Sequence, residues 1–318
     1  LFIHMKSYGP SSHSVPMDNA GGVDWNTSGS TDMSRSGTST SILLSTMTTP
    51  LAVKVWIRAS SEFQFEVSSP TPLIFMLRPR SGAQQWVANE SYTLTPNVSV
   101  SEITDKYGNL CQRIVAPVGD FNISTVSEVE TADQYDEEPA APFVEIPLLP
   151  ESVLEYLLPS RYCESDRFGQ MTFDLVKDVQ PGYQQVAKIV SWVKENISFK
   201  PLSSTYPVSA AEVNQRREGV CRDLAQISMA MCRSICIPSR LVVGYLHGLE
   251  PMDIHAWFEA YVGGRWYVFD PTQEDLKGGR IAIAYGRDAA DVAIYNQYGP
   301  LLLPKKMLVS VEQISKGA

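Results

Sequence analysis

Two adjacent glycines between two strand-like segments constrain this sequence more than any other feature. The segment HAWFEAYV precedes Gly263-Gly264 and the segment RWYVFD follows it. Both segments are rich in aromatic residues, which favour strands. A Gly-Gly pair at such a position predicts a two-residue hairpin, because the favoured turn needs positive φ at its central residues. The sequence therefore predicts an antiparallel sheet here, with a fixed register between its strands.

The predicted turn determines which residues face each other across the hairpin. If Val262 faces Arg265, then Trp257 faces Asp270. His255 lies two residues before Trp257 on the same strand face, so it is the diagonal neighbour of Asp270. Diagonal Cβ atoms lie roughly 7 Å apart, which longer side chains can bridge. A hydrogen bond between the imidazole and the carboxylate is therefore predicted.

The two faces of the hairpin have different predicted roles. Asp253, on the same strand face as His255, is a rival partner and ranks second, because it lies beside His255 along the strand. The face that carries His255 and Trp257 is expected to pack against the helix that begins at Cys221. The opposite face is predicted to be core and carries Ala256, Phe258, Ala260, Tyr267 and Phe269.

Residues 51–129 have the pattern of a series of short strands. Segments such as EFQFEV and FNISTVSEVE alternate apolar and polar residues, and turn residues such as the YGN around Gly108 separate them. This pattern predicts an antiparallel β-sandwich domain over residues 47–130. LAVKVWIRA and EFQFEV are predicted to be separate strands.

Composition divides the rest of the chain. Residues 1–46 are rich in Ser, Thr and Gly and bury little apolar surface, which predicts a disordered or non-native leader, with Met47 as a candidate start. Residues 131–150 are acidic and rich in proline, as in a linker between domains. Residues 151–318 begin with helical spacing and continue into strands. They predict an α+β domain in which helices pack on an antiparallel sheet.

Cys221 opens one of the predicted helices. Leu224, Ile227 and Met231 follow it at helical spacing, and the helix is expected to stop before Pro238. The first-turn N–H groups and the helix dipole favour an anion, so they favour the thiolate of Cys221 and can hold an oxyanion. Free cysteines are also often simply packed, so the position alone leaves a structural interpretation open.

Composition and charge exclude several classes of function. The net charge of −9 gives no positive surface for nucleic acid or an anionic membrane, and no segment approaches the ~18 apolar residues of a membrane span. The 5 cysteines are irregularly spaced, which predicts free thiols and a cytoplasmic location. No metal or cofactor site is expected. Cys232 and Cys236, about one helical turn apart, are predicted to be core.

Cys221, His255 and Asp270 together supply a nucleophile, a base and a residue that orients the base. Each residue alone also fits a structural role. His255 fits a hydrogen-bonded histidine at a strand start, and Asp270, directly before Pro271, fits a turn residue.

Three segments resemble the transglutaminase-like core of bacterial cysteine proteases: GVCRDLAQISMAMC, DIHAWFEAYVGGRWYVFDPT and GRIAIAYGRDAADVA. The β-rich first half resembles the N-terminal region that accompanies this core in those proteins. The resemblance spans roughly residues 51–309. It implies a papain-like α+β core in which Cys221 is the nucleophile, His255 the general base and acid, and Asp270 the orienting residue.

The resemblance also implies an activity, namely hydrolysis of peptide or protein amides through a thioester. Transamidation of protein glutamine by the same residues is an alternative, as is a non-catalytic binding module of the same fold. The expected partner is a peptide or protein substrate, and neither nucleic acid nor a membrane. The family's layout places a second oxyanion donor near residues 199–204. The calcium loops and zinc-binding CxxC pairs found elsewhere in the superfamily have no counterpart in this sequence.

Overall fold

The computed structural model describes part of the chain. The described residues are 3–5, for the backbone only, and 53–82, 84–201, 203–204, 206–274 and 278–315. The predicted leader of residues 1–46 thus lies outside the described residues, apart from β1 (Ile3–Met5). No helix within the described ranges is long and apolar enough to cross a membrane.

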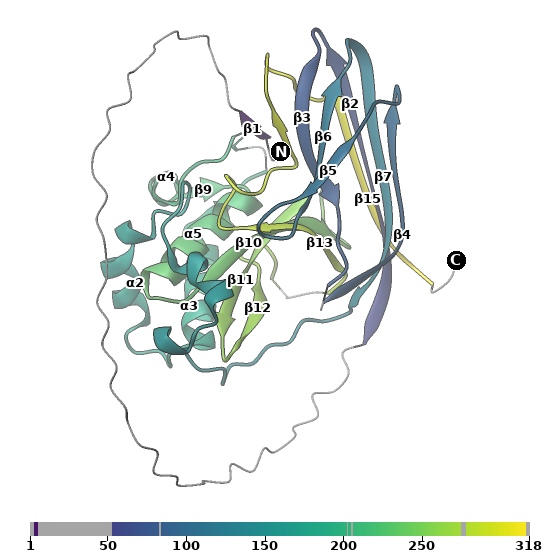
Figure 1. Cartoon of the computed structure of the whole chain (residues 1–318). Coiled ribbons are helices and arrows are strands. Elements are labelled where there is room, and N and C mark those ends of the chain that lie inside the picture. Colours follow the sequence, from purple (N-terminus) through teal and green to yellow (C-terminus); the bar gives the residue numbers. More distant parts are fainter. Residues whose placement is uncertain are drawn as a thin grey trace, which may run out of the picture. The chain divides into compact units, whose positions relative to one another are not determined.

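Two sheets pack face to face as a β-sandwich (Figure 1). The first has the order β15-β2-β7-β4 and contains β2 (Lys54–Val67), β4 (Gln85–Thr95), β7 (Gly119–Ala132) and β15 (Lys306–Ile314). The second has the order β1-β14-β3-β6-β5 and adds β3 (Thr71–Arg78), β5 (Ser101–Thr104), β6 (Leu110–Ala116) and β14 (Tyr295–Gln297).

Aromatic side chains fill the space between these two sheets. The ring of Phe65 on β2 lies 6.2 Å from Phe75 on β3 and 5.5 Å from Tyr295 on β14. The predicted sandwich is confirmed. The prediction of separate strands at its start is wrong, because β2 is continuous. Ser61 is buried within β2 and its hydroxyl lies 2.8 Å from that of Thr125 on β7, so a residue typical of turns continues the strand.

A helical layer follows the sandwich strands in the sequence. It contains α1 (Glu151–Leu154), α2 (Gly169–Val176), α3 (Tyr183–Asn196), α4 (Ala210–Arg216) and α5 (Cys221–Ser234). Between them lie the 3-10 turns η1 (Ile146–Leu148), η2 (Glu155–Leu157) and η3 (Ser165–Arg167), and the parallel pair β8 (Ser198–Phe199) and β9 (Glu218–Gly219). α5 is the central helix, since most of its side chains are buried on every side.

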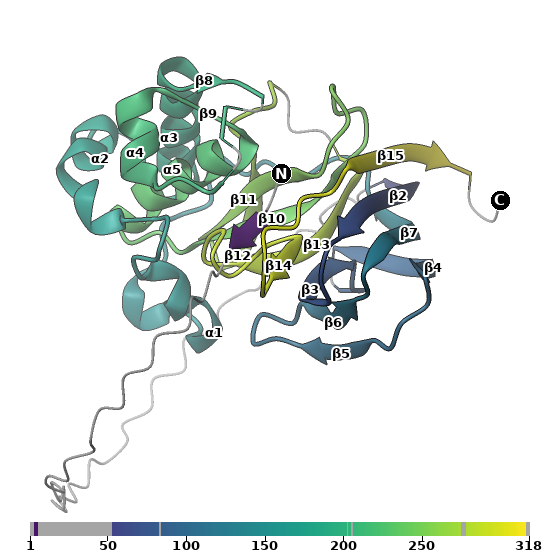
Figure 2. The ribbon, with the colours of Figure 1, turned by 90° about the horizontal axis from the view of Figure 1, so that it is seen from above.

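The helices pack on a four-stranded antiparallel sheet of order β12-β11-β10-β13 (Figure 2). Its strands are β10 (Ser239–Leu246), β11 (His255–Val262), β12 (Arg265–Phe269) and β13 (Arg280–Gly286). Val262 pairs with Arg265, and both turn glycines have positive φ, 58° at Gly263 and 86° at Gly264. The predicted hairpin and its register are confirmed, as is the α+β fold.

The two faces of this sheet have different neighbours. Phe258 lies in the same apolar cluster as Leu224 and Ile227 of α5, whereas Trp257 and Val268 belong to a separate cluster. The expectation that the Trp257 face packs against the helix from Cys221 is therefore wrong. The helix covers the opposite face, where small alanines alternate with Phe258 and leave room for close packing.

A glycine controls how β13 joins the sheet. The pairing of β10 with β13 shifts register between Val243 and Gly244. A Cβ atom added at Gly244 would lie 1.9 Å from the carbonyl oxygen of Ile281, so only glycine allows the two backbones to approach this closely. β13 begins one residue before Ile281, at Arg280, and the close approach therefore sets where Arg280 enters the sheet.

The segment predicted as a linker packs along the hairpin of β11 and β12. The N–H of Gly263 donates to the carbonyl of Pro142 at 2.7 Å, and Tyr135 packs against the cluster that contains Trp257.

The last strand belongs to the sandwich. β15 pairs with β2 over its whole length, although the domain prediction gave residues 151–318 to the α+β domain. The domain boundaries stay a prediction.

Candidate active site

Cys221 is the first residue of α5, at the end of the helix that faces a cavity. Val220 before it is extended, with φ −90° and ψ 175°, and its N–H donates to the Asp223 carboxylate at 3.2 Å. This contact fixes the chain where it enters the helix. The N–H of Cys221 belongs to the first turn, where the helix supplies no carbonyl for it to bond.

His255 and Asp270 form a buried hydrogen-bonded pair. Nε2 of His255 lies 2.7 Å from Oδ2 of Asp270, and both side chains are almost fully buried. His255 is the first residue of β11 and Asp270 directly follows β12, so the hairpin register brings them together. With Nε2 committed to Asp270, Nδ1 is the ring nitrogen left for Cys221, whose side chain interacts with His255 and raises its pKa. Asp253 instead accepts the N–H of Ile254 at 2.7 Å.

Two further residues hold the Asp270 carboxylate. Oδ1 accepts hydrogen bonds from the N–H and the hydroxyl of Thr272, at 3.0 and 2.7 Å. Nη1 of Arg280 donates to Oδ2 at 2.9 Å. Neither Thr272 nor Arg280 was singled out by sequence. The Asp-Pro-Thr turn could have indicated Thr272, because a carboxylate commonly accepts from the residue two positions later.

The charges within this cluster shift the pKa values of its members. Burial on its own lowers the pKa of His255, but the charge of Asp270 and its hydrogen bond outweigh burial, and the Cys221 side chain adds to the effect. The pKa of His255 is thereby raised to about 9. Burial also opposes ionisation of Asp270, yet the positive charges of His255 and Arg280 hold its pKa well below the usual range. At neutral pH the pair is an imidazolium and a carboxylate.

A second buried ion pair lies beside Cys221. Nε of Arg222 donates to Oδ1 of Asp223 at 3.0 Å, and neither side chain is exposed. Arg222 also donates to the hydroxyl of Ser204 and to the carbonyl of Tyr206, each at 3.0 Å. The Ser204 hydroxyl in turn donates to Asp223. These contacts tie the start of α5 to the segment around Ser204, where the second oxyanion donor is predicted.

The cavity in front of Cys221 has a volume of about 360 Å³. Cys221 and His255 both line it, and so do Phe199, the last residue of β8, and Ser204 from the segment after β8. Its other wall is the loop before β11, which supplies a mostly apolar surface and two carboxylates. The wall residues are Leu249, Glu250, Pro251, Met252, Asp253 and Ile254.

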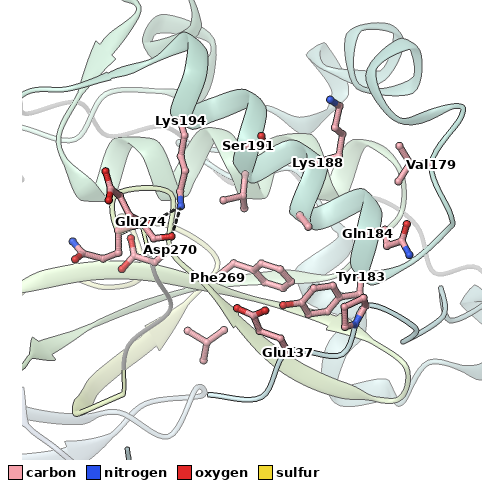
Figure 3. A pocket seen from close by; sticks show the side chains of 15 residues that line it. Glu137, Val179, Tyr183, Gln184, Lys188, Ser191, Lys194, Phe269, Asp270 and Glu274 are labelled. Atoms are coloured by element: carbon pink, nitrogen blue, oxygen red, sulfur yellow. Dashed lines mark hydrogen bonds between the residues drawn. The ribbon is translucent and has the colours of Figure 1, made fainter. Parts of the chain in front are cut away.

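A larger hollow, of about 590 Å³, lies between α3 and the turn after β12 (Figure 3). Lys194 of α3 reaches across it to the carbonyls of Gln273 and Glu274. Asp270 lines this hollow, but neither a cysteine nor a histidine is among the described residues around it. Of these two cavities, only the smaller has both a cysteine and a histidine among its described lining residues.

The remaining cysteines contribute nothing to this cavity. Burial raises the pKa of Cys111 to about 11 and that of Cys163 to about 12, and Cys232 is also buried. Cys236 is exposed, so its prediction as core is wrong. α5 ends at Ser234, and Cys236 lies beyond it with φ 63°, off the buried helix face. No group of three metal-ligating side chains occurs in the described part of the chain.

Comparisons with known proteins identify the family of this chain. Residues 169–271 match the sequence model of the transglutaminase-like superfamily. The chain is 30% identical to a crystal structure from Cytophaga hutchinsonii named as a "putative cysteine protease", with a TM-score of 0.77. That alignment covers 84% of this chain and 94% of the solved one.

Two mycobacterial relatives are also similar. Uncharacterized protein ML0607 of Mycobacterium leprae (strain TN) is 26% identical over 231 residues, which are 68% of this chain and 82% of the relative. Uncharacterized protein Mb2599c of Mycobacterium bovis is 30% identical over 128 residues, 36% of this chain and 41% of that relative. With 30% identity across nearly all of a solved relative, and a core that matches the family model, the chain belongs to the transglutaminase-like superfamily.

Proposed function

We propose that the protein is a cysteine protease or peptidase that hydrolyses amide bonds through a thioester on Cys221. The observation that carries the proposal is the His255–Asp270 hydrogen bond of 2.7 Å, beside the cavity that also contains the Cys221 thiol. A nucleophile, a base and a residue that orients the base are the parts that acyl transfer needs. The similarity to the Cytophaga hutchinsonii protein favours hydrolysis over other acyl transfers.

The first half of the proposed reaction forms the acyl-enzyme. The Cys221 thiolate, paired with the His255 imidazolium, attacks the carbonyl carbon of a substrate amide. The carbonyl oxygen becomes an oxyanion, which the N–H of Cys221 at the start of α5 stabilises. His255 then gives its proton to the leaving nitrogen, the C–N bond breaks, and an amine departs from a thioester.

The second half returns the enzyme to its starting state. His255, now neutral, takes a proton from a water molecule as the water oxygen attacks the thioester carbonyl. The C–S bond breaks, the carboxylic acid leaves, and the thiolate–imidazolium pair is restored. If an amine attacks in place of water, the same steps give transamidation.

The lining of the cavity supports a peptide or protein substrate with an apolar or basic side chain at the acylated residue. Phe199, Met252 and Ile254 offer apolar contact, whereas Glu250 and Asp253 are acidic and make no ion pair with any described residue. Arg222 lines the same cavity, but it is held by Asp223, Ser204 and the Tyr206 carbonyl. The His255 imidazolium is likewise paired, with Asp270, so an acidic substrate side chain would meet negative charge without an unpaired cation to compensate it.

The test compares wild type with Cys221→Ala on a peptide library, with and without an added primary amine. Both proteins carry Cys236→Ser, since Cys236 is the exposed cysteine of the described residues and would react with probes. Wild type should release peptide fragments, and Cys221→Ala should release none. In the same background, iodoacetamide should label Cys221 faster than the buried cysteines at neutral pH.

Each other outcome contradicts the proposal in a different way. Amine incorporation without cleavage would make the protein a transamidase. Slow labelling of Cys221 together with no product from any peptide would indicate a binding module of the same fold. Cleavage that persists in Cys221→Ala would place the reaction elsewhere.

A further inference from the structure

We propose that Arg280 is a positioning residue of this centre, which anchors Asp270 and limits how tightly Asp270 holds the proton of His255. The proposal rests on the proposed function for its catalytic meaning. Its structural content, the competition of two cations for one carboxylate oxygen, can be measured without any substrate.

Both oxygens of the Asp270 carboxylate are held by hydrogen bonds. Oδ2 of Asp270 accepts from both Nε2 of His255, at 2.7 Å, and Nη1 of Arg280, at 2.9 Å. Oδ1 is occupied by the two bonds from Thr272. Because both oxygens are held, the carboxylate cannot rotate, and the direction in which it presents Oδ2 to the imidazole is fixed.

Arg280 is itself held in place. It is buried at the first position of β13, and the centre of its guanidinium lies 5.0 Å from the ring centroid of Trp257. The Trp257 ring also lies 6.1 Å from that of His255, with an angle of 29° between the planes. The same indole therefore contacts both donors to Asp270, so neither can move without disturbing the other.

The charge of Arg280 also affects how strongly Asp270 holds the proton of His255. Asp270 and Arg280 cancel, and so do the thiolate of Cys221 and the imidazolium of His255, so the buried centre is neutral in its reactive form. Arg280 and His255 are like charges that share one acceptor oxygen. Each disfavours the other, and the positive charge of Arg280 therefore weakens the hold of Asp270 on the imidazolium. Proton release to the leaving amine becomes easier as a result.

Other charged or titratable groups near this centre do not substitute for Arg280. Tyr135, from the segment after β7, interacts with the Arg280 charge, and burial raises the pKa of its hydroxyl, so it is neutral at working pH. Glu259 on β11 is paired with Arg240 at 2.6 Å. Asp253 bonds to the N–H of Ile254, and Lys194 is bonded to the carbonyls after Asp270.

Three variants separate charge from hydrogen bonding. Arg280→Met removes both, Arg280→Gln keeps a donor without charge, and Arg280→Lys keeps the charge. The measurement is a pH titration of the Nε2–H signal of His255 in protein labelled with ¹⁵N-histidine. The chain has 4 histidines, so the signal is assigned by its absence in His255→Gln.

The proposal expects the midpoint of that titration to rise by about one pH unit or more in the Met and Gln variants, because a like charge has been removed. The Lys variant should stay close to wild type. On a cleaved substrate, the Met variant should lose about tenfold or more in kcat with KM nearly unchanged. Circular dichroism and urea midpoints confirm that each variant is folded.

An unchanged or lowered midpoint in a folded Gln or Met variant would overturn the proposal. So would a Lys variant that shifts as far as the Gln variant, because charge would then not be the cause. A wild type with no activity on any peptide would count against the proposed hydrolysis, while leaving the titration as a test of Arg280.

Discussion

Two buried Arg–Asp pairs flank Cys221 and His255, and they differ in the other groups that each carboxylate binds. Arg222 and Asp223 lie beside the nucleophile at the start of α5, with a contact of 3.0 Å. Arg280 and Asp270 lie beside the base, with a contact of 2.9 Å. All four side chains are almost fully shielded from solvent.

The difference lies in the other partners of each carboxylate. Asp223 holds the N–H of Val220 and the hydroxyl of Ser204, and neither group titrates near neutral pH. Asp270 holds His255, which does. In the proposed mechanism, the same type of ion pair thus serves as scaffold on one side and as part of an acid–base system on the other. A buried ion pair next to a reactive cysteine does not by itself indicate chemistry.

The largest expected effect comes from breaking the scaffold pair. Asp223→Ala leaves Arg222 buried without its carboxylate, which costs about 3–5 kcal/mol of unfolding free energy. Urea denaturation measures the loss, with Asp270→Ala as the matched change in the other pair. We expect the Asp270 variant to lose a similar amount of stability, because it also leaves a buried arginine without its carboxylate, and in addition to lose about 10²–10⁴-fold in turnover. A folded Asp223→Ala variant that loses as much turnover as Asp270→Ala would show that the pairs do not differ as described.

A smaller effect is expected in the pH dependence of the stability that the His255–Asp270 pair contributes. Because the folded state raises the pKa of His255 to about 9, the stability from its proton is full below about pH 6.5 and disappears as pH rises through about 9. The stability advantage of wild type over His255→Gln should therefore shrink by about 3 kcal/mol across that window. Urea midpoints at pH 6, 7.5 and 9 measure this change. An advantage that is constant with pH would contradict the charged His255–Asp270 pair.

The smallest expected effect is at Ser204. Ser204→Ala removes the hydroxyl that bridges Asp223 and Arg222 but leaves the ion pair intact, so we expect a loss of about 1 kcal/mol. The rate of Cys221 alkylation should fall less than twofold. Thermal melts and a labelling time course measure the two quantities. A large fall in labelling would place Ser204 in the chemistry and not in the scaffold.

The sequence was sufficient for those parts of the site that depend on local structure. Gly263-Gly264 fixes a register over a few residues, so the hydrogen bond between His255 and Asp270 could be predicted from alternation alone. The helix from Cys221 was predicted from its spacing, for the same reason. The role of these residues in catalysis stays a proposal.

The features that could not be predicted from the sequence depend on contacts between segments far apart in the chain. Arg280 reaches Asp270 only because β13 pairs with β10, 34 or more positions earlier in the chain, through an irregular register that no local pattern predicts. The face of the hairpin that α5 covers was mispredicted because both faces are buried, one by helices and one by the cluster around Trp257. Periodicity cannot distinguish two buried faces.

The close approach at Gly244, which pairs with His255 across β10 and β11, makes the arrangement around Asp270 depend on a residue that has no side chain. Any side chain at this position would push β13 away from β10 and carry Arg280 with it. The arrangement therefore depends on Gly244 as well as on Cys221, His255 and Asp270. A relative that keeps all three residues but has lost this glycine would have to hold its base by another arrangement.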